Sequence, residues 1–262
     1  MTEEKAHYWN RVAKAWQEAP PKTLWRAYND AVNASLFACW LPPGGIETLL
    51  KTDLFDESLG DGLYPLLASR AKNVVGMDIS ILTSHSARSR RGGLQAVNAD
   101  VRHLPFVNGA FDVIVSNSTL DHFESSDDIV ASLRELNRVL RAGGQLFLTL
   151  DNLANPIIAL RNTLPFRLLN HLNIVPYYVG TTFGPSCLCR HLNQVGLEVL
   201  EVSAVMHFPR MFTMAIAHIL ERHTRPKIQR HFLHFLMSFE HLSCWPTRFL
   251  TGYFVAVRAI KR

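Results

Sequence analysis

Three apolar segments between residues 73 and 121 each end in a polar group, and this alternation restricts the fold more than any other feature of the chain. The segments 73–78 and 94–100 end in Asp78 and Asp100, and the third ends in the polar run 116–118. The third segment contains the continuous apolar run 113–115, as expected for a strand buried on both faces. With helical segments between the strands, the pattern predicts an α/β fold built on a parallel sheet.

The polar strand ends also predict a ligand. In a doubly wound sheet the carboxyl ends of the strands lie along one rim, and ligands bind in the crevice there. Asp78 is then placed to accept hydrogen bonds from a ribose, and Asp100 to face an adenine. The spacing therefore indicates a ligand that contains adenosine.

The composition suits one globular chain and excludes several classes of protein. Of 262 residues, 48% are hydrophobic and 19% charged, which argues against disorder. We expect no transmembrane helix and a cytoplasmic location, because the N-terminus lacks a signal-peptide core and no run of eighteen apolar residues occurs. The net charge of +5 is too mild to indicate nucleic-acid binding. No metal site is expected, since Cys187, Cys189 and His191 lack a second ligand pair.

Further elements complete the expected sheet. Residues 5–40 show helical spacing with a break at Pro20-Pro21, and a helix that starts near Ser125 is expected to end at Gly143-Gly144. Four more strands are predicted at 49–55, 145–150, 198–205 and 252–259. The last of these follows a long connection and is expected to insert antiparallel at the sheet edge.

Four segments, in order and at regular intervals, resemble the motifs of one enzyme family. GMDIS, NADVRHLPF and FDVIVSNSTLDHF are similar to its second-, third- and fourth-strand motifs, and VLRAGGQLFLTL to its helix, turn and fifth strand. The family is that of the class I S-adenosylmethionine-dependent methyltransferases, in a form similar to type 11. The resemblance covers residues 46–152 and the final strand.

The resemblance implies a doubly wound, Rossmann-like methyltransferase fold with a mostly parallel seven-stranded sheet. A single domain over residues 1–262 is expected. It would comprise an N-terminal helical lid (1–45), a cofactor-binding core (46–152), a substrate or cap region (153–250) with a helical insertion, and the final strand (251–262). Trp9, Trp16 and Trp25 would belong to the lid, although simple packing of amphipathic helices explains them equally well.

The resemblance also implies S-adenosyl-L-methionine as the cofactor and assigns its contacts. The residues expected to bind it are Asp78 with Ile79 for the ribose, Asp100 with Val101 for the adenine, and Asn117 with Ser118 for the methionine end.

The first motif departs from the family pattern acid-x-G-x-G-x-G. The chain has TDLFDESLGDG, in which Asp53 matches the acid while Phe55 and Glu57 occupy glycine positions. A loop of different shape is expected, because glycine lets the backbone approach a ligand without a Cβ. We expect the loop from Asp53 to Gly60 to hold the methionine part, with Asp53 or Glu57 against its α-ammonium group. The alternative is a degenerate site that no longer binds the cofactor.

Methyl transfer from a sulfonium requires positioning more than a single catalytic group, because the cofactor carries the difficult chemistry. His122 is the candidate base, needed only for a protonated acceptor. Its structural alternative is to cap or pack the following helix. Asp121 is expected either to orient the substrate or to cap that helix.

These expectations lead to one predicted function and one alternative. The prediction is methyl transfer by direct displacement to a small-molecule acceptor. The Phe- and Met-rich insertion 208–249 favours an apolar or aromatic acceptor, and it equally fits a helical cap or a homodimer surface. The alternative is a non-catalytic binding or scaffold protein on a degenerate methyltransferase fold.

Overall fold

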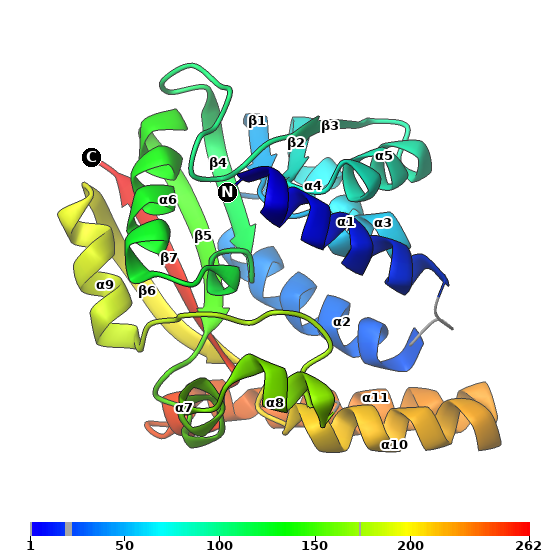
Figure 1. The fold of residues 1–262 in the computed structure, drawn as a ribbon. Helices are drawn as coiled ribbons and strands as arrows, with labels where there is room; N and C mark the ends of the chain where they lie inside the picture. The colour runs from blue at the N-terminus through cyan, green and yellow to red at the C-terminus, as the bar shows by residue number, and fades with distance from the viewer. Residues whose placement is uncertain (1, 19–22, 173) are drawn as a thin grey trace.

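The computed structural model describes residues 2–18, 23–172 and 174–262 (Figure 1). A seven-stranded sheet with the order β3-β2-β1-β4-β5-β7-β6 forms its centre. The strands are β1 Ile46–Lys51, β2 Ala71–Asp78, β3 Leu94–Asn98, β4 Phe111–Asn117, β5 Leu140–Asp151, β6 Leu197–Val205 and β7 Phe254–Lys261. Strands β1 to β5 pair in parallel, and β7 pairs antiparallel with both of its neighbours. The predicted α/β, mostly parallel sheet is confirmed.

The position of the last strand corrects one prediction. Strand β7 lies between β5 and β6 and not at the sheet edge: Val257 pairs with Leu148 on one side and with Val202 on the other. Val255, Val257 and Ala259 are fully buried. A strand that is covered on both faces gains most from hydrogen-bond partners on both sides, which an edge position does not provide.

Helices cover both faces of the sheet. On one face, α6 (Ser126–Val139) and α9 (Pro185–Gln194) pack on a cluster that includes Ile114 and Leu148. On the other, α2 (Thr23–Trp40) and α4 (Tyr64–Arg70) pack on a cluster that includes Val113 and Phe147. Helix α5 (Ile81–Arg90) follows β2. Because alternate residues of a strand face opposite sides, neighbours such as Val113 and Ile114 belong to different clusters.

Helix α6 begins as predicted and ends earlier than predicted. The Ser125 side chain accepts a hydrogen bond from the backbone N–H of Asp127 at 3.0 Å, which caps the first turn. The helix stops at Val139, and the predicted stop at Gly143-Gly144 is wrong because these glycines lie inside β5. Gly143 has φ of 73°, and the pairing of β4 with β5 is irregular next to it. The glycines therefore allow a local irregularity in the strand.

The N-terminal helix α1 (Thr2–Glu18) lies across the carboxyl ends of the strands. It contacts α5, and its Asn10 side chain accepts a 2.7 Å hydrogen bond from Ser80, the residue that caps α5. Trp16 and Phe55 meet in an edge-to-face contact. The break predicted at Pro20-Pro21 lies outside the described residues.

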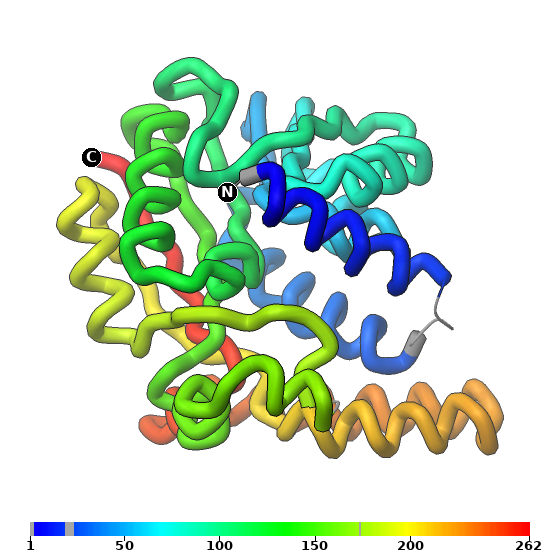
Figure 2. The backbone as a smooth tube through the Cα atoms, in the orientation of Figure 1, coloured from blue at the N-terminus to red at the C-terminus, as the bar shows by residue number. Residues whose placement is uncertain are grey.

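The segment after β5 forms the rest of the molecule. Besides α9, its helices are α7 Pro156–Thr163, α8 Phe166–His171, α10 Arg210–His223, α11 Pro226–Ser238 and α12 Arg248–Thr251. Between α8 and α9 the chain runs past the end of β4 (Figure 2). There the backbone N–H of Gly180 donates a hydrogen bond to the backbone carbonyl oxygen of Asp121. Helices α10 and α11 contact α2. No helix within the described residues has the length and apolar character needed to cross a bilayer.

Candidate cofactor site

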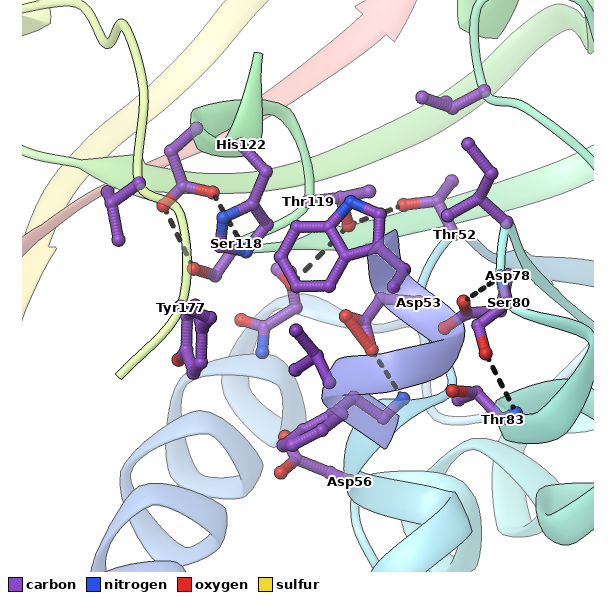
Figure 3. Close-up of a pocket in the computed structure, with 18 of the residues that line it drawn as sticks. Thr52, Asp53, Asp56, Asp78, Ser80, Thr83, Ser118, Thr119, His122 and Tyr177 are labelled. Carbon is purple, nitrogen blue, oxygen red and sulfur yellow. Dashed lines mark hydrogen bonds and ion pairs between the residues drawn. The ribbon is translucent and has the colours of Figure 1, made fainter. Parts of the chain in front are cut away.

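A cavity lies at the carboxyl ends of β1, β2 and β4, with α1 and α2 on its other side (Figure 3). Its space free of protein atoms, part of it open to solvent, is about 1570 Å³. The residues predicted for the site that line it are Asp53, Asp78, Ile79, Asp100, Val101, Asn117, Ser118, Asp121 and His122. Figure 3 shows Asp53 between the side of the cavity with His122 and Tyr177 and the side with Asp78 and Ser80. This is the rim at which doubly wound sheets bind ligands.

The loop after β1 is a short helix in place of a run of glycines. The Asp53 carboxylate accepts a 2.6 Å hydrogen bond from the backbone N–H of Phe55, and helix α3 (Phe55–Leu59) begins there. Phe55 and Asp53 both line the cavity. Burial raises the pKa of Asp53 to about 6.

Glu57 and Gly60 do not line this cavity, which corrects their predicted contact with the cofactor. The Glu57 carboxylate is fully buried, 2.9 Å from the Nζ of Lys51, and accepts the backbone N–H of Leu63 at 2.9 Å. The charge of Glu57 raises the pKa of Lys51 although burial opposes this. The Gly60 oxygen accepts from Arg91 at 2.8 Å. Both residues therefore hold α3 and its connection against the sheet.

Asp78 ends β2 inside the cavity. Its two carboxylate oxygens accept from the backbone N–H groups of Ser80 at 2.8 Å and Leu54 at 3.2 Å. Burial raises the pKa of Asp78 to about 7, and the nearby charge of Asp53 adds to this. No basic side chain among the described residues lies within ion-pair distance of Asp53 or Asp78. Each carboxylate oxygen has further lone pairs, so both groups can still bind a ligand.

Asp100 lines the cavity with much less free capacity. The Arg102 guanidinium donates to its two oxygens at 2.6 and 3.0 Å. Burial opposes ionisation here, but the hydrogen bonds from Arg102 hold the pKa of Asp100 below its ordinary value. Its contact with an adenine stays a prediction. The Arg102 pair restricts such a contact, because it leaves few lone pairs on the Asp100 oxygens to accept a hydrogen bond from the base.

The turn after β4 is strained at the cavity wall. Ser118 has φ of 49°, an uncommon value for a residue with a Cβ. Thr149 holds this turn: its hydroxyl accepts from the Ser118 backbone at 3.0 Å and donates to the Asn117 side chain at 2.8 Å. Ser118 also donates to Asp121 at 2.9 Å. Strain of this kind gathers at functional sites, where the surrounding contacts enforce it.

His122 lies in the 3₁₀ turn Leu120–His122 with one ring nitrogen engaged. Its Nδ1 is 2.9 Å from the backbone oxygen of Tyr178, and a carbonyl oxygen only accepts, so this pairing assigns the proton of the neutral ring to Nδ1. Nε2 is 3.9 Å from Oδ1 of Asp121, beyond hydrogen-bond distance. Asp121 is 1% exposed, and its Oδ1 has no hydrogen-bond partner within the described part of the chain. The arrangement leaves a nitrogen lone pair next to a carboxylate.

Several residues of the site carried no recognisable signal in the sequence. Tyr177, in an irregular segment, has its ring 5.6 Å from that of His122 and 6.0 Å from that of Trp9. The Thr52 hydroxyl is 2.9 Å from that of Thr119, and both line the cavity. Trp9, Trp16 and Trp25 line it as well, which fits both interpretations given to them above.

The cavity suits S-adenosylmethionine in charge and in hydrogen bonding. This cofactor has a sulfonium and an α-ammonium group, and Asp53 and Asp78 supply two carboxylates with no basic ion-pair partner in the described residues. Its ribose hydroxyls are donors, for which the Asp78 oxygens are acceptors. The observed donor and acceptor set therefore fits the cofactor without the glycine loop.

Comparisons with known proteins agree with this reading. The family described as "Methyltransferase domain" matches residues 56–148. The malonyl-[acyl-carrier protein] O-methyltransferase of Legionella pneumophila is 36% identical over 103 residues, covering 37% of this chain and 35% of that protein. The probable tRNA methyltransferase 9B of Homo sapiens is 33% identical over 93 residues, covering 36% and 20%. The chain thus spans about a third or less of the length of these two relatives.

A solved structure has the same fold over the whole chain. It is a SAM-dependent methyltransferase of Thermotoga maritima, described as a possible histamine N-methyltransferase, with a TM-score of 0.62 and 15% identity. The match covers 98% of this chain and 99% of that one. At this identity the likeness establishes the fold alone. The family match over residues 56–148, the relatives and the motifs at the strand ends together support a class I S-adenosylmethionine-dependent methyltransferase domain in this chain, with S-adenosylmethionine as its cofactor.

Proposed function

We propose that this chain transfers a methyl group from S-adenosylmethionine to a small-molecule acceptor in the cytoplasm. One observation carries the proposal: the two carboxylates Asp53 and Asp78 and the imidazole of His122 line the same cavity at the strand ends. The first two suit a cationic cofactor, and the third suits an acceptor that must lose a proton.

Each part of the cofactor has a matching group in the cavity wall. S-adenosylmethionine, when bound, supplies the methyl group on a sulfonium that is attacked directly. Asp78 and Ile79 would hold the ribose, and Asp53 the α-ammonium group. Asp100 and Val101 would lie at the adenine, and Asn117 and Ser118 at the methionine end.

Positioning is the main catalytic effect of this proposal, and it can supply on the order of 7–11 kcal/mol. His122 accepts the acceptor's proton at Nε2 where the acceptor is protonated. The hydrogen bond from Nδ1 to the oxygen of Tyr178 keeps the ring oriented for this. Asp121 stabilises the resulting imidazolium, because its Oδ1 is already 3.9 Å from Nε2.

The cavity wall favours a small, apolar or aromatic acceptor. The rings of Trp9, Phe55 and Tyr177 lie close together there, with Trp9 and Tyr177 6.0 Å and Phe55 and Tyr177 6.4 Å apart. Such rings can stack on a planar acceptor. RNA is the competing acceptor class, since one relative is a probable tRNA methyltransferase.

Calorimetric titration of S-adenosylhomocysteine into the wild type and the Asp78→Ala variant tests the proposal. We expect micromolar binding by the wild type and at least a tenfold loss in the variant, about 1.4 kcal/mol. The exposed Asp127→Ala variant, outside the cavity, is the matched control and should bind like the wild type. Release of S-adenosylhomocysteine with panels of aromatic small molecules and with tRNA then distinguishes the acceptor classes. A folded wild type that does not bind would favour the non-catalytic scaffold.

A further inference from the structure

The segment after β5 exposes many large apolar side chains. Seven of them have exposed fractions between 37% and 65%, and together they form what we call the 153–174 surface: Leu153, Ile157, Leu160, Leu164, Leu168, Leu172 and Ile174. Four of these leucines recur every fourth residue from 160 to 172. Ile158 and Leu169 on the same helices are buried, so α7 and α8 already contribute apolar side chains to the protein interior. Exposed apolar groups gathered in this way mark an interaction surface.

The charged residues of this segment carry one sign. Residues 152–197 contain no aspartate or glutamate, while Arg167 and Arg190 are exposed. Arg161 differs from these two arginines because it is buried, with its Nη1 2.7 Å from Oδ2 of Asp151. Helices α10 and α11 continue the pattern with one acid, Glu221, in residues 210–238. Exposed basic side chains there are Arg222, Arg225, Lys227 and Arg230.

These helices lie at the same border of the molecule. In Figure 1, α7, α8, α10 and α11 all lie along the lower edge of the view, away from β3 and α5. Met211, Phe212 and Ile219 of α10 are also exposed, by 58% or more. Apolar and basic side chains with few acids are the combination that binds an anionic lipid surface, with the apolar groups at the acyl boundary and the cations at the headgroups.

A second copy of the chain is a poorer partner for this surface. A two-fold contact would place each basic, acid-free surface against itself. Arg167 would then meet like charges with no carboxylate from residues 152–197 to offset them. An anionic bilayer provides the opposite charge and an apolar interior together.

A smaller cavity lies next to both this surface and the cofactor site. It is lined by Leu164, Phe166, Leu169 and Val175, among others, and it shares Val179 with the main cavity. Leu164 belongs to the 153–174 surface as well. If the proposed methyl transfer is correct, this placement favours an acceptor dissolved in the lipid.

We propose that the 153–174 surface docks on an anionic lipid bilayer. The leucines of α7 and α8 enter the boundary between headgroups and acyl chains, and Arg167 binds the headgroups together with the basic residues of α10 and α11. The docking itself is independent of the chemistry in the cofactor site.

Co-sedimentation with vesicles tests the proposal. The probes are vesicles of phosphatidylcholine alone and of phosphatidylcholine with phosphatidylglycerol at three to one. The test variant is Leu160→Glu/Leu168→Glu, and its matched control is Val107→Glu/Leu200→Glu, which places the same charges on exposed positions outside the 153–174 surface and outside α10 and α11. We expect the wild type and the control to bind the anionic vesicles. The test variant should bind at least ~10-fold more weakly, and raising the salt should weaken wild-type binding.

Other results would overturn the docking proposal. These are a wild type that leaves both vesicle types in the supernatant, or equal binding by the test variant and its control. A wild-type dimer that Leu160→Glu/Leu168→Glu converts to a monomer, without vesicle binding, would assign the surface to a second copy. Titration of the same variants with S-adenosylhomocysteine distinguishes failure of the docking proposal from failure of the proposed function. A variant that loses vesicle binding and keeps its affinity for S-adenosylhomocysteine has lost only the docking surface.

Discussion

The Nδ1 atom of His122 lies 2.9 Å from the backbone oxygen of Tyr178, and this contact joins the end of β4 to the segment between α8 and α9. The same segment donates backbone hydrogen bonds at Gly180 and Thr181 to the oxygens of Asp121 and Phe123. The histidine is thus held by a part of the chain that is more than fifty residues away in sequence. Its ring lines the cavity next to the rings of Trp9 and Tyr177.

This contact predicts the tautomer and the kinetic role of His122. Nitrogen-15 NMR should show neutral His122 with a proton on Nδ1 and none on Nε2, and the His122→Gln spectrum identifies the resonance. With an acceptor found through S-adenosylhomocysteine release, His122→Gln should lower kcat by roughly 10²–10⁴ while cofactor affinity stays the same. A proton on Nε2 in the neutral ring would contradict the tautomer assignment. An unchanged kcat in His122→Gln would show that His122 is not the general base.

Asp78 should make the protein less stable as the pH rises. Its folded-state pKa, about 7, lies above the ordinary aspartate value of 3.8, so between about pH 4 and pH 7 the unfolded state binds fewer protons than the folded state. Stability therefore falls as the pH rises through this window. We expect Asp78→Asn to raise the free energy of unfolding at pH 8 by on the order of 1–3 kcal/mol and to change it little near pH 4.

Urea unfolding at both pH values measures this difference, with Asp127→Asn as the exposed control. Equal effects of Asp78→Asn at pH 4 and pH 8 would show that burial does not perturb this carboxylate. The same variant should bind S-adenosylhomocysteine more weakly, so stability and cofactor binding would change in opposite directions.

Breaking the Lys51–Glu57 pair should cost far more than breaking an exposed pair. Lys51 and Glu57 are 3% and 0% exposed at 2.9 Å, and either partner alone would leave an unpaired buried charge. Glu57→Gln should lower the free energy of unfolding by roughly 3–5 kcal/mol, and Lys51→Met/Glu57→Leu should recover much of it. The control is Glu47→Gln at the exposed Lys72–Glu47 pair, where we expect less than about 1 kcal/mol. Similar losses at both pairs, in urea unfolding, would contradict the prediction.

Helix α1 should become more protected when the cofactor site is filled. Trp9 and Trp16 line the cavity, and α1 is tied to α5 through Asn10 and Ser80. Hydrogen–deuterium exchange of residues 2–18 should slow on addition of S-adenosylhomocysteine, and Trp9→Ala should reduce this slowing and speed cofactor release. Exchange in α9, which contacts β6 and β7, is the internal control. No change in residues 2–18 at saturating ligand would mean that α1 packs on the core without acting as a lid.

The sequence predicted the sheet better than it predicted the loop that follows β1. Strands β3 and β4 lie within the segments expected for them, because each is a short apolar run with polar residues at its end. The first strand was expected over 49–55 and ends at Lys51. The cause is local: the Asp53 side chain accepts from Phe55 and starts a helix where an extended chain was expected.

Contacts between distant residues account for the other differences. Glu57 was expected at the cofactor because its position matches a family motif, but its partner is the buried Lys51, which motif spacing does not reveal. The neighbours of β7 depend on pairing with β5, more than one hundred residues earlier. Tyr177 reaches the site only because the chain between α8 and α9 crosses the end of β4. The periodicity of apolar residues identifies helices and strands, and it carries no information on contacts between residues that are distant in the sequence.

The place of β7 has a consequence for synthesis. Until residues 254–261 leave the ribosome, β5 and β6 have no strand between them, and each has an unpaired row of backbone groups. The first five strands can pair as they emerge, but the sheet closes only with the last one. A ribosome that stalls before residues 254–261 have emerged would therefore hold a nascent chain with two open strand edges, which is the form most prone to pair with another copy and to be recognised by chaperones.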